Sequence, residues 1–173
     1  MIHGDIKPQN VLVYKDITGR TTVKVADFGY STLGAGEAGR VFLPKSRPWN
    51  APEHHFGGFT TYDAKKTDVY SFGILCLWVL FGNTYIPLDR MERPTELMSF
   101  HASTGPQTSL EQLKYDDKVE VLANTLMESV SLADFNAEHR IRLKEFFSLT
   151  VTINPEKRTS DFGRLLYLLG RER

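Results

Sequence analysis

One apolar segment near the middle of the chain constrains the fold more than any other feature. Residues 69–81 form a run of 13 residues that is apolar apart from Ser71 and Gly73. A membrane span needs about 18 or more apolar residues, so this run is too short to cross a bilayer. We expect a helix over residues 67–81 that ends at Gly82-Asn83. Because such a helix has no polar stripe, it must be surrounded by protein and is expected to be the centre of the fold.

The other patterns predict a mainly helical protein with one short β-hairpin. Two β-rich runs, residues 11–14 and 22–26, flank a turn at Gly19 and predict the hairpin. Amphipathic patterns predict helices over residues 109–128, 139–151 and 159–169. Residues 31–50 have no clear period and predict a long loop, and residues 87–106 predict a linking segment. No domain boundary stands out, so we expect residues 1–173 to form one domain.

Composition excludes several classes of protein. The chain has 21 basic and 21 acidic residues, which argues against a nucleic-acid-binding surface. A single cysteine, Cys76, rules out an internal disulfide framework and a thiolate zinc site. The first twenty residues contain charges and no apolar core of a signal peptide. We therefore expect an intracellular protein, cytoplasmic or nuclear and not secreted, with neither nucleic acid nor a membrane as partner.

The first ten residues carry a chemical motif. The sequence His-Gly-Asp-Ile-Lys-Pro-Gln-Asn at residues 3–10 is a dense polar cluster directly before the first expected strand. Asp5, Lys7 and Asn10 supply a base, a fixed cation and an oxygen ligand for magnesium, which phosphoryl transfer to a hydroxyl needs. The alternative is a polar turn before a hairpin.

Further motifs turn this cluster into a family resemblance. They are Asp-Phe-Gly at residues 27–29, directly after the second strand, Ala-Pro-Glu at 51–53, Asp-Val-Tyr-Ser-Phe-Gly at 68–73, and Asn-Pro-Glu-Lys-Arg at 154–158. In this order the motifs resemble the eukaryotic protein kinases. The resemblance covers nearly the whole chain. It implies a protein-kinase-like C-terminal lobe, mainly α with a short β-hairpin, with an activation segment at about residues 27–53.

The resemblance implies a protein serine/threonine kinase that uses ATP and Mg²⁺ to phosphorylate hydroxyl groups of protein substrates. Asp5 would be the catalytic base, and Lys7 would contact the γ-phosphate. Asn10 and Asp27 would ligate magnesium. The lysine at position 7 is typical of serine/threonine kinases, whereas tyrosine kinases usually place Ala or Arg nearby.

The resemblance also implies roles around the substrate and the nucleotide. Ser46 stands where the family keeps a threonine of the substrate loop, and it retains the hydroxyl. Leu12 would form the floor under adenine. Leu75 and Val79 would extend that apolar column into the core.

A third group of residues would hold the lobe together. His3 and Phe28 would belong to a second column, which Asp68 anchors from below. Glu53 and Arg158 would form a buried ion pair. The alternative for this pair is two solvated charges.

Three other features have simpler interpretations. A second Asp-Phe-Gly at residues 161–163 follows no strand, so we interpret it as a first-turn acid and a core aromatic of the last helix. His54-His55 could suggest a metal, but no third ligand is within reach in the sequence. Cys76 lies among apolar residues and is expected to be an inert core thiol.

The chain also departs from the family pattern. Gly4 stands where most kinases carry an arginine that binds a phosphate on the activation loop, so we expect independence from such a phosphate. Residues 34–39 have the glycine spacing of a nucleotide loop, but they lie inside the activation segment, and a mobile loop is the better interpretation. The resemblance implies a Gly-rich loop and a lysine-bearing strand before His3, and the printed sequence has two residues there.

We therefore expect a partial catalytic domain without its N-terminal lobe, inactive alone, with one flank of the central helix uncovered. A chain that supplies the missing lobe would be a partner. The alternatives are a non-catalytic, pseudokinase-like interaction module, a fragment from a truncated gene model, and a decaying relic with no stable fold.

Overall fold

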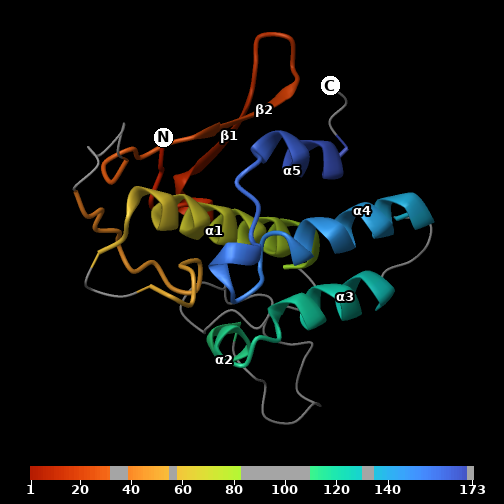
Figure 1. The fold of residues 1–173 in the computed structure, drawn as a ribbon. Helices are drawn as coiled ribbons and strands as arrows, with labels where there is room; N and C mark the ends of the chain where they lie inside the picture. The colour runs from red at the N-terminus through yellow and green to blue at the C-terminus, as the bar shows by residue number, and fades with distance from the viewer. Residues whose placement is uncertain (32–38, 55–57, 83–109, 130–134, 171–173) are drawn as a thin grey trace, which may run out of the picture.

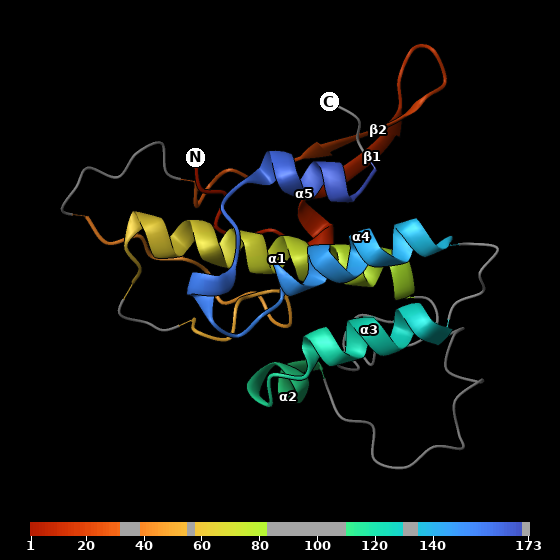
Figure 2. The same ribbon diagram turned by 45° about the vertical axis from the view of Figure 1, so that its right-hand side comes forward.

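The computed structural model describes residues 1–31, 39–54, 58–82, 110–129 and 135–170. Helix α1 (Thr61–Phe81) runs through the middle of the molecule (Figure 1). The hairpin and helix α5 lie on one side of α1, and helices α2 and α3 lie on the other side in both ribbon views (Figure 2). Helix α4 contacts both α3 and α5. The bounds of these elements are β1 (Val11–Lys15), β2 (Thr21–Val25), α2 (Leu110–Tyr115), α3 (Val119–Ser129), α4 (Ala137–Ser148) and α5 (Phe162–Leu168).

The predicted hairpin is present. Strands β1 and β2 pair antiparallel, with Val11 opposite Val25 and Lys15 opposite Thr21. The Asp16 carboxylate closes the turn by accepting hydrogen bonds from the backbone amides of Thr18 at 2.8 Å and Arg20 at 3.1 Å. Short 3₁₀ turns, Pro8–Asn10 and Pro155–Lys157, precede β1 and α5.

Helix α1 begins six residues before the position that the apolar pattern predicted. Thr60 caps it, because its hydroxyl oxygen accepts a hydrogen bond from the backbone amide of Asp63 at 3.1 Å. The added turns are more polar and therefore fell outside the apolar run. Most of the helix is buried, but Val79 is 67% exposed. The expectation that protein surrounds the helix on every side is therefore wrong at Val79.

The predicted helix over residues 109–128 is two helices. Asp117 adopts φ +54°, a left-handed conformation that cannot continue α2. Its carboxylate accepts a hydrogen bond from the backbone amide of Ile153 at 3.2 Å, so a tertiary contact holds the break. The amphipathic pattern runs through the break because α2 and α3 both turn apolar residues toward the same core.

The last two helices begin at capping side chains. Asn136 caps α4 and Asp161 caps α5, each accepting a hydrogen bond from a backbone amide three residues later. Asp161 is thus an N-cap and not a first-turn acid. Phe162 is 42% exposed, which corrects its assignment to the core, although its ring lies 6.1 Å from that of Phe72.

Two predicted loops are described only in part or not at all. Residues 39–50 have no helix or strand, and Val41 forms a β-bridge with Phe59. The linking segment at residues 87–106 and most of the glycine-rich stretch at 34–39 lie outside the described residues.

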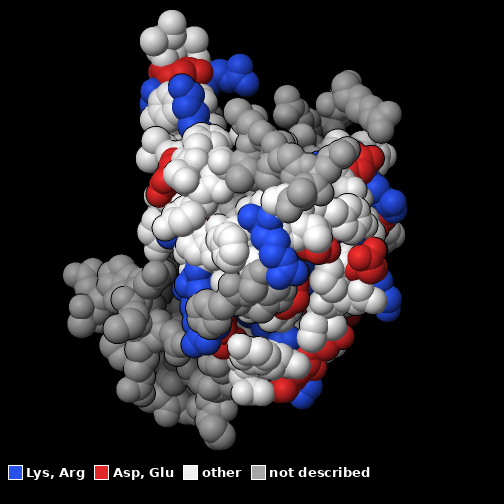
Figure 3. Space-filling model, turned by 60° about the vertical axis from the view of Figure 1, so that its left-hand side comes forward, with Lys and Arg blue, Asp and Glu red and all other residues white. Residues whose placement is uncertain are grey.

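The surface mixes both signs of charge. Lys, Arg, Asp and Glu side chains alternate on the face shown in Figure 3, including the projecting end of the hairpin. Local charge rather than net charge therefore decides what each surface can bind. None of the helices in the described ranges combines the length and hydropathy that crossing a bilayer requires.

Candidate active site

The segment before the hairpin is fastened to the central helix by one carboxylate. Asp68 of α1 accepts hydrogen bonds from the backbone amides of His3 at 2.6 Å and Gly4 at 2.9 Å. Burial raises the pKa of the Asp68 carboxyl above its ordinary value, although the two amides act in the opposite direction. Gly4 has φ +84°, and a Cβ there would lie 2.8 Å from Cδ2 of Leu43. The bend at this point therefore favours glycine.

Asp5 is buried at the centre of a small polar cluster. Its Oδ2 lies 2.8 Å from Nζ of Lys7 and accepts a hydrogen bond from the Asn10 side-chain amide at 3.2 Å. The same amide donates to the Asp5 backbone carbonyl at 2.8 Å. Oδ1 of Asp5 is buried and has no hydrogen-bond partner within the described part of the chain. One oxygen is thus fixed, and the other can accept a hydrogen bond from a further group.

Asn10 and the first Asp-Phe-Gly meet at the base of the hairpin. The backbone carbonyl of Asn10 accepts a hydrogen bond from the backbone amide of Ala26 at 2.8 Å. This bond continues the β1–β2 ladder by one step. Asp27 follows directly, exposed, with φ +62°. This conformation is uncommon outside glycine and turns the chain sharply after β2.

These two residues fit a magnesium ion. The Asn10 amide nitrogen faces Asp5, which leaves the amide oxygen as the atom that could ligate a metal. Mg²⁺ is usually held by one or two protein carboxylates together with substrate phosphates. In the described ranges no group of three His, Cys, Asp or Glu side chains could hold a metal without such additional ligands.

The rings of His3 and Phe28 connect the two motifs. Their centroids lie 5.1 Å apart in a tilted arrangement. Nε2 of the His3 ring also lies 3.1 Å from the backbone carbonyl oxygen of Ala26. Because Asp68 binds the His3 backbone, these contacts form one continuous path from α1 to Phe28.

Glu53 and Arg158 form a two-pronged ion pair. The guanidinium lies 2.5 Å and 2.9 Å from the two carboxylate oxygens. Arg158 is almost fully buried and lies over the Tyr70 ring at 4.7 Å. The structure therefore brings this pair together, 105 residues apart in sequence, and excludes two solvated charges.

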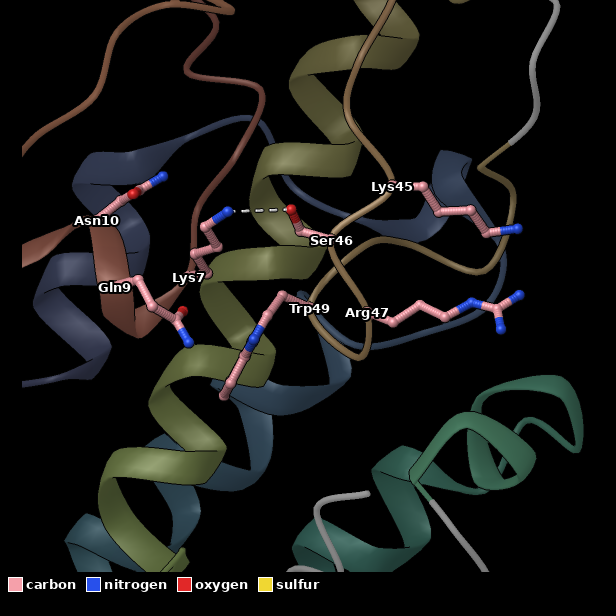
Figure 4. A pocket seen from close by; sticks show the side chains of 7 residues that line it. All are labelled: Lys7, Gln9, Asn10, Lys45, Ser46, Arg47 and Trp49. Atoms are coloured by element: carbon pink, nitrogen blue, oxygen red, sulfur yellow. Dashed lines mark hydrogen bonds between the residues drawn. The ribbon is translucent and has the colours of Figure 1, made fainter. Parts of the chain in front are cut away.

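A pocket of about 520 Å³ lies next to the Asp5 cluster. Figure 4 shows its lining: Lys7, Gln9, Asn10, Lys45, Ser46, Arg47 and Trp49. Lys7 donates a hydrogen bond from Nζ to Oγ of Ser46 at 3.2 Å, so the predicted substrate-loop residue does meet the predicted catalytic loop. The sequence interpretation did not single out four of these residues, Gln9, Lys45, Arg47 and Trp49. The alternation Lys-Ser-Arg around Ser46 is the signal that could have found two of them.

Comparison with known protein families matches residues 1–164 to the protein kinase domain. The chain belongs to the protein kinase family. It is 26% identical over 164 residues to wall-associated receptor kinase 3 of Arabidopsis thaliana, covering 91% of this chain and 21% of that protein. It is 32% identical over 174 residues to the probable L-type lectin-domain containing receptor kinase II.1 of the same plant, covering 98% and 22%. It is 46% identical over 79 residues to dual specificity protein kinase shkD of Dictyostelium discoideum, covering 45% and 10%.

The kinase chain spans about a fifth of the length of the first curated relatives that it matches. Family membership confirms the resemblance drawn from the motifs. The mainly helical fold with a two-stranded hairpin agrees with the C-terminal lobe that the resemblance implied.

The apolar column that was predicted to extend from Leu12 into the core needs correction at one residue. Leu75 is half-buried. Val79 is exposed and does not extend a column into the core. Its place on the apolar helix suggested burial, but none of the described segments packs over that flank.

The simpler interpretations of His54 and Cys76 can be compared with the structure. The His54 ring lies 3.0 Å from the Leu43 carbonyl through Nε2, and His55 lies outside the described residues. Cys76 is half-buried, and desolvation raises the pKa of its thiol to about 12. A thiol that stays protonated at neutral pH is a poor nucleophile.

Proposed function

We propose that this kinase domain transfers the γ-phosphoryl group of ATP to serine or threonine hydroxyls of proteins. The observation that carries the proposal is the Asp5 carboxylate, which has one oxygen fixed by Lys7 and Asn10 and the other buried without a partner in the described ranges. A substrate hydroxyl that donates to Oδ1 would be oriented for attack, and Asp5 would accept its proton.

Lys7 is placed to assist the same step. Its ammonium contacts both Asp5 at 2.8 Å and Ser46 at 3.2 Å. A cation here offsets negative charge on the transferred phosphoryl group. The Ser46 hydroxyl holds the ammonium between the catalytic loop and the substrate loop.

Asn10 and Asp27 would hold the magnesium that accompanies ATP. Their closeness follows from the hydrogen bond between Asn10 and Ala26, the residue before Asp27. When bound, the ion supplies positive charge to the phosphates. Leu12, exposed on β1, would lie under the adenine ring.

The test is phosphoryl transfer from labelled ATP to a serine- or threonine-containing protein. A polypeptide of residues 1–173 alone is expected to be inactive, because it holds no Gly-rich loop to position the phosphates ahead of Asp5. A fusion that places the N-terminal lobe of a serine/threonine kinase before residue 1 is expected to be active. In the fusion, Asp5→Asn should reduce kcat by about 100-fold or more, and Asp27→Asn should abolish transfer.

The second Asp-Phe-Gly offers a matched control. Asp161→Asn changes the same residue type in the same tripeptide, and Asn caps a helix as well as Asp does. This variant should keep its activity. Activity that survives Asp27→Asn but not Asp161→Asn would show that the wrong aspartate was assigned. A folded fusion without any transfer would favour the non-catalytic interaction module.

A further inference from the structure

We infer that the pocket beside Asp5 selects protein substrates in which acidic residues flank the accepting serine or threonine. The inference rests on the proposed function, because it assumes that the accepting hydroxyl lies at Asp5. Among the described residues that line the pocket, three are cationic, Lys7, Lys45 and Arg47, and none carries a carboxylate. A peptide that enters it therefore meets positive charge.

Two of these cations, Lys7 and Arg47, also contact a carboxylate of the protein. Lys7 is paired with Asp5 at 2.8 Å. Arg47 approaches Glu111 only through Nε, at 3.7 Å, and its side chain is 58% exposed. A guanidinium has five donors in a fixed fork, so this single loose contact leaves Arg47 able to bind a carboxylate in two-pronged fashion.

Glu111 is also engaged by a second cation. Nζ of Lys114 lies 2.6 Å from Oε1 of Glu111 and donates to the Pro48 carbonyl at 2.9 Å. Lys114 is almost fully buried, so its ammonium lies close to Glu111 in a medium that screens poorly. Because Lys114 is the closer of the two cations to Glu111, Arg47 remains available to a further carboxylate.

The directions of the side chains indicate where the acidic residues of a substrate lie. They lie beside the serine or threonine that accepts the phosphoryl group, and not at that position. In Figure 4 the side chains of Lys45 and Arg47 extend in the same direction, away from Gln9 and Asn10, whereas Lys7 reaches toward Ser46. An extended peptide advances about 3.3–3.6 Å per residue, so residues near the acceptor can reach Lys45 and Arg47. The two cations point away from Asn10, the proposed metal ligand, so the anion that they meet belongs to the peptide and not to the nucleotide.

The test measures peptide binding and does not require catalysis. Fluorescence anisotropy would compare two labelled peptides on residues 1–173, each with one central serine, flanked on both sides by Glu in one and by Gln in the other. The Glu peptide should bind about three- to tenfold more tightly at low salt, and the ratio should fall toward one at high salt. In Lys45→Gln/Arg47→Gln the ratio should be close to one at any salt concentration.

The matched control removes two exposed lysines outside the pocket, Lys24→Gln/Lys65→Gln, and should keep the preference at the same net charge. Circular dichroism would establish that both double variants are folded. Equal binding of the two peptides to the unmodified chain, or a Glu preference that survives Lys45→Gln/Arg47→Gln, would overturn the inference. Phosphorylation of both peptides at equal rates by the active fusion would overturn it too while leaving the proposed function intact. A preference for the Glu peptide, without any phosphoryl transfer by the fusion, would overturn the proposed function and leave the charge preference of the pocket intact.

Discussion

Replacing Arg158 by Met should destabilise the kinase lobe more than any surface substitution. The change keeps an unbranched apolar stem and removes the guanidinium. Besides the two contacts with Glu53, that guanidinium donates hydrogen bonds to the carbonyls of Thr152 at 2.9 Å, Lys66 at 3.2 Å and Ile153 at 3.1 Å. All of these acceptors would lose a charged donor at once.

The expected loss is about 3–5 kcal/mol in the free energy of unfolding, which is the usual result of removing one partner of a buried ion pair. Simple addition of a desolvation penalty for each acceptor would give more, at about 1–3 kcal/mol each. The Glu53 side chain is 24% exposed, however, so water can reach its carboxylate and limit the cost. For a domain of this size the loss corresponds to a fall in Tm of roughly 6–20 °C.

The assay is urea unfolding followed by circular dichroism. One slope m of the free energy of unfolding against urea concentration is fitted to all variants. Arg164→Met is the matched control, because Arg164 pairs with Glu145 on the surface, with both side chains at least 41% exposed. This control should lose about 1 kcal/mol or less. Glu53→Gln/Arg158→Met should be less destabilised than the sum of the single variants. Losses of equal size for Arg158→Met and Arg164→Met would refute the claim that burial makes this ion pair matter.

Three further predictions concern packing, regulation and pH. Gly73→Ala should destabilise the lobe by about 1–3 kcal/mol, because its Cβ would lie 2.6 Å from Oγ1 of Thr150; unchanged urea unfolding would contradict this. Ser31→Ala in the active fusion should leave the rate near normal, because Gly4 offers no cation to a phosphate there; a tenfold loss of kcat would contradict this. Asp68→Asn should alter the pH dependence of stability. The folded state holds more protons than the unfolded state from pH 3.8 up to the raised pKa of Asp68, so wild-type stability relative to the variant should fall as pH rises through this window. A rise in urea unfolding experiments over the same window would show that the sign is wrong.

Much of the site could be predicted because its residues are close in sequence or lie in motifs of fixed order. Asp5, Lys7 and Asn10 fall within six positions, so a single turn before β1 was enough to bring their side chains together. Two β-rich runs and the turn at Gly19 likewise predicted the hairpin, and the pairing register then brought Ala26, the residue before Asp27, opposite Asn10.

Element ends were predicted less well, because they depend on single contacts and not on a repeating pattern. The start of α1 depends on the Thr60 cap, and the break after α2 depends on Asp117, whose carboxylate binds the backbone of Ile153. A contact across 36 residues leaves no periodic trace in the sequence.

The sequence by itself determined the central helix, the hairpin and the family motifs, because periodicity and local spacing are written in neighbouring residues. Only the tertiary structure decided which apolar residues stay exposed, such as Val79, and which charges outside the motifs are buried, such as Lys114. It alone placed Lys45 and Arg47 on the wall of a pocket beside Lys7. Burial and local charge depend on what packs against a residue from distant parts of the chain, and residue type does not specify that neighbour.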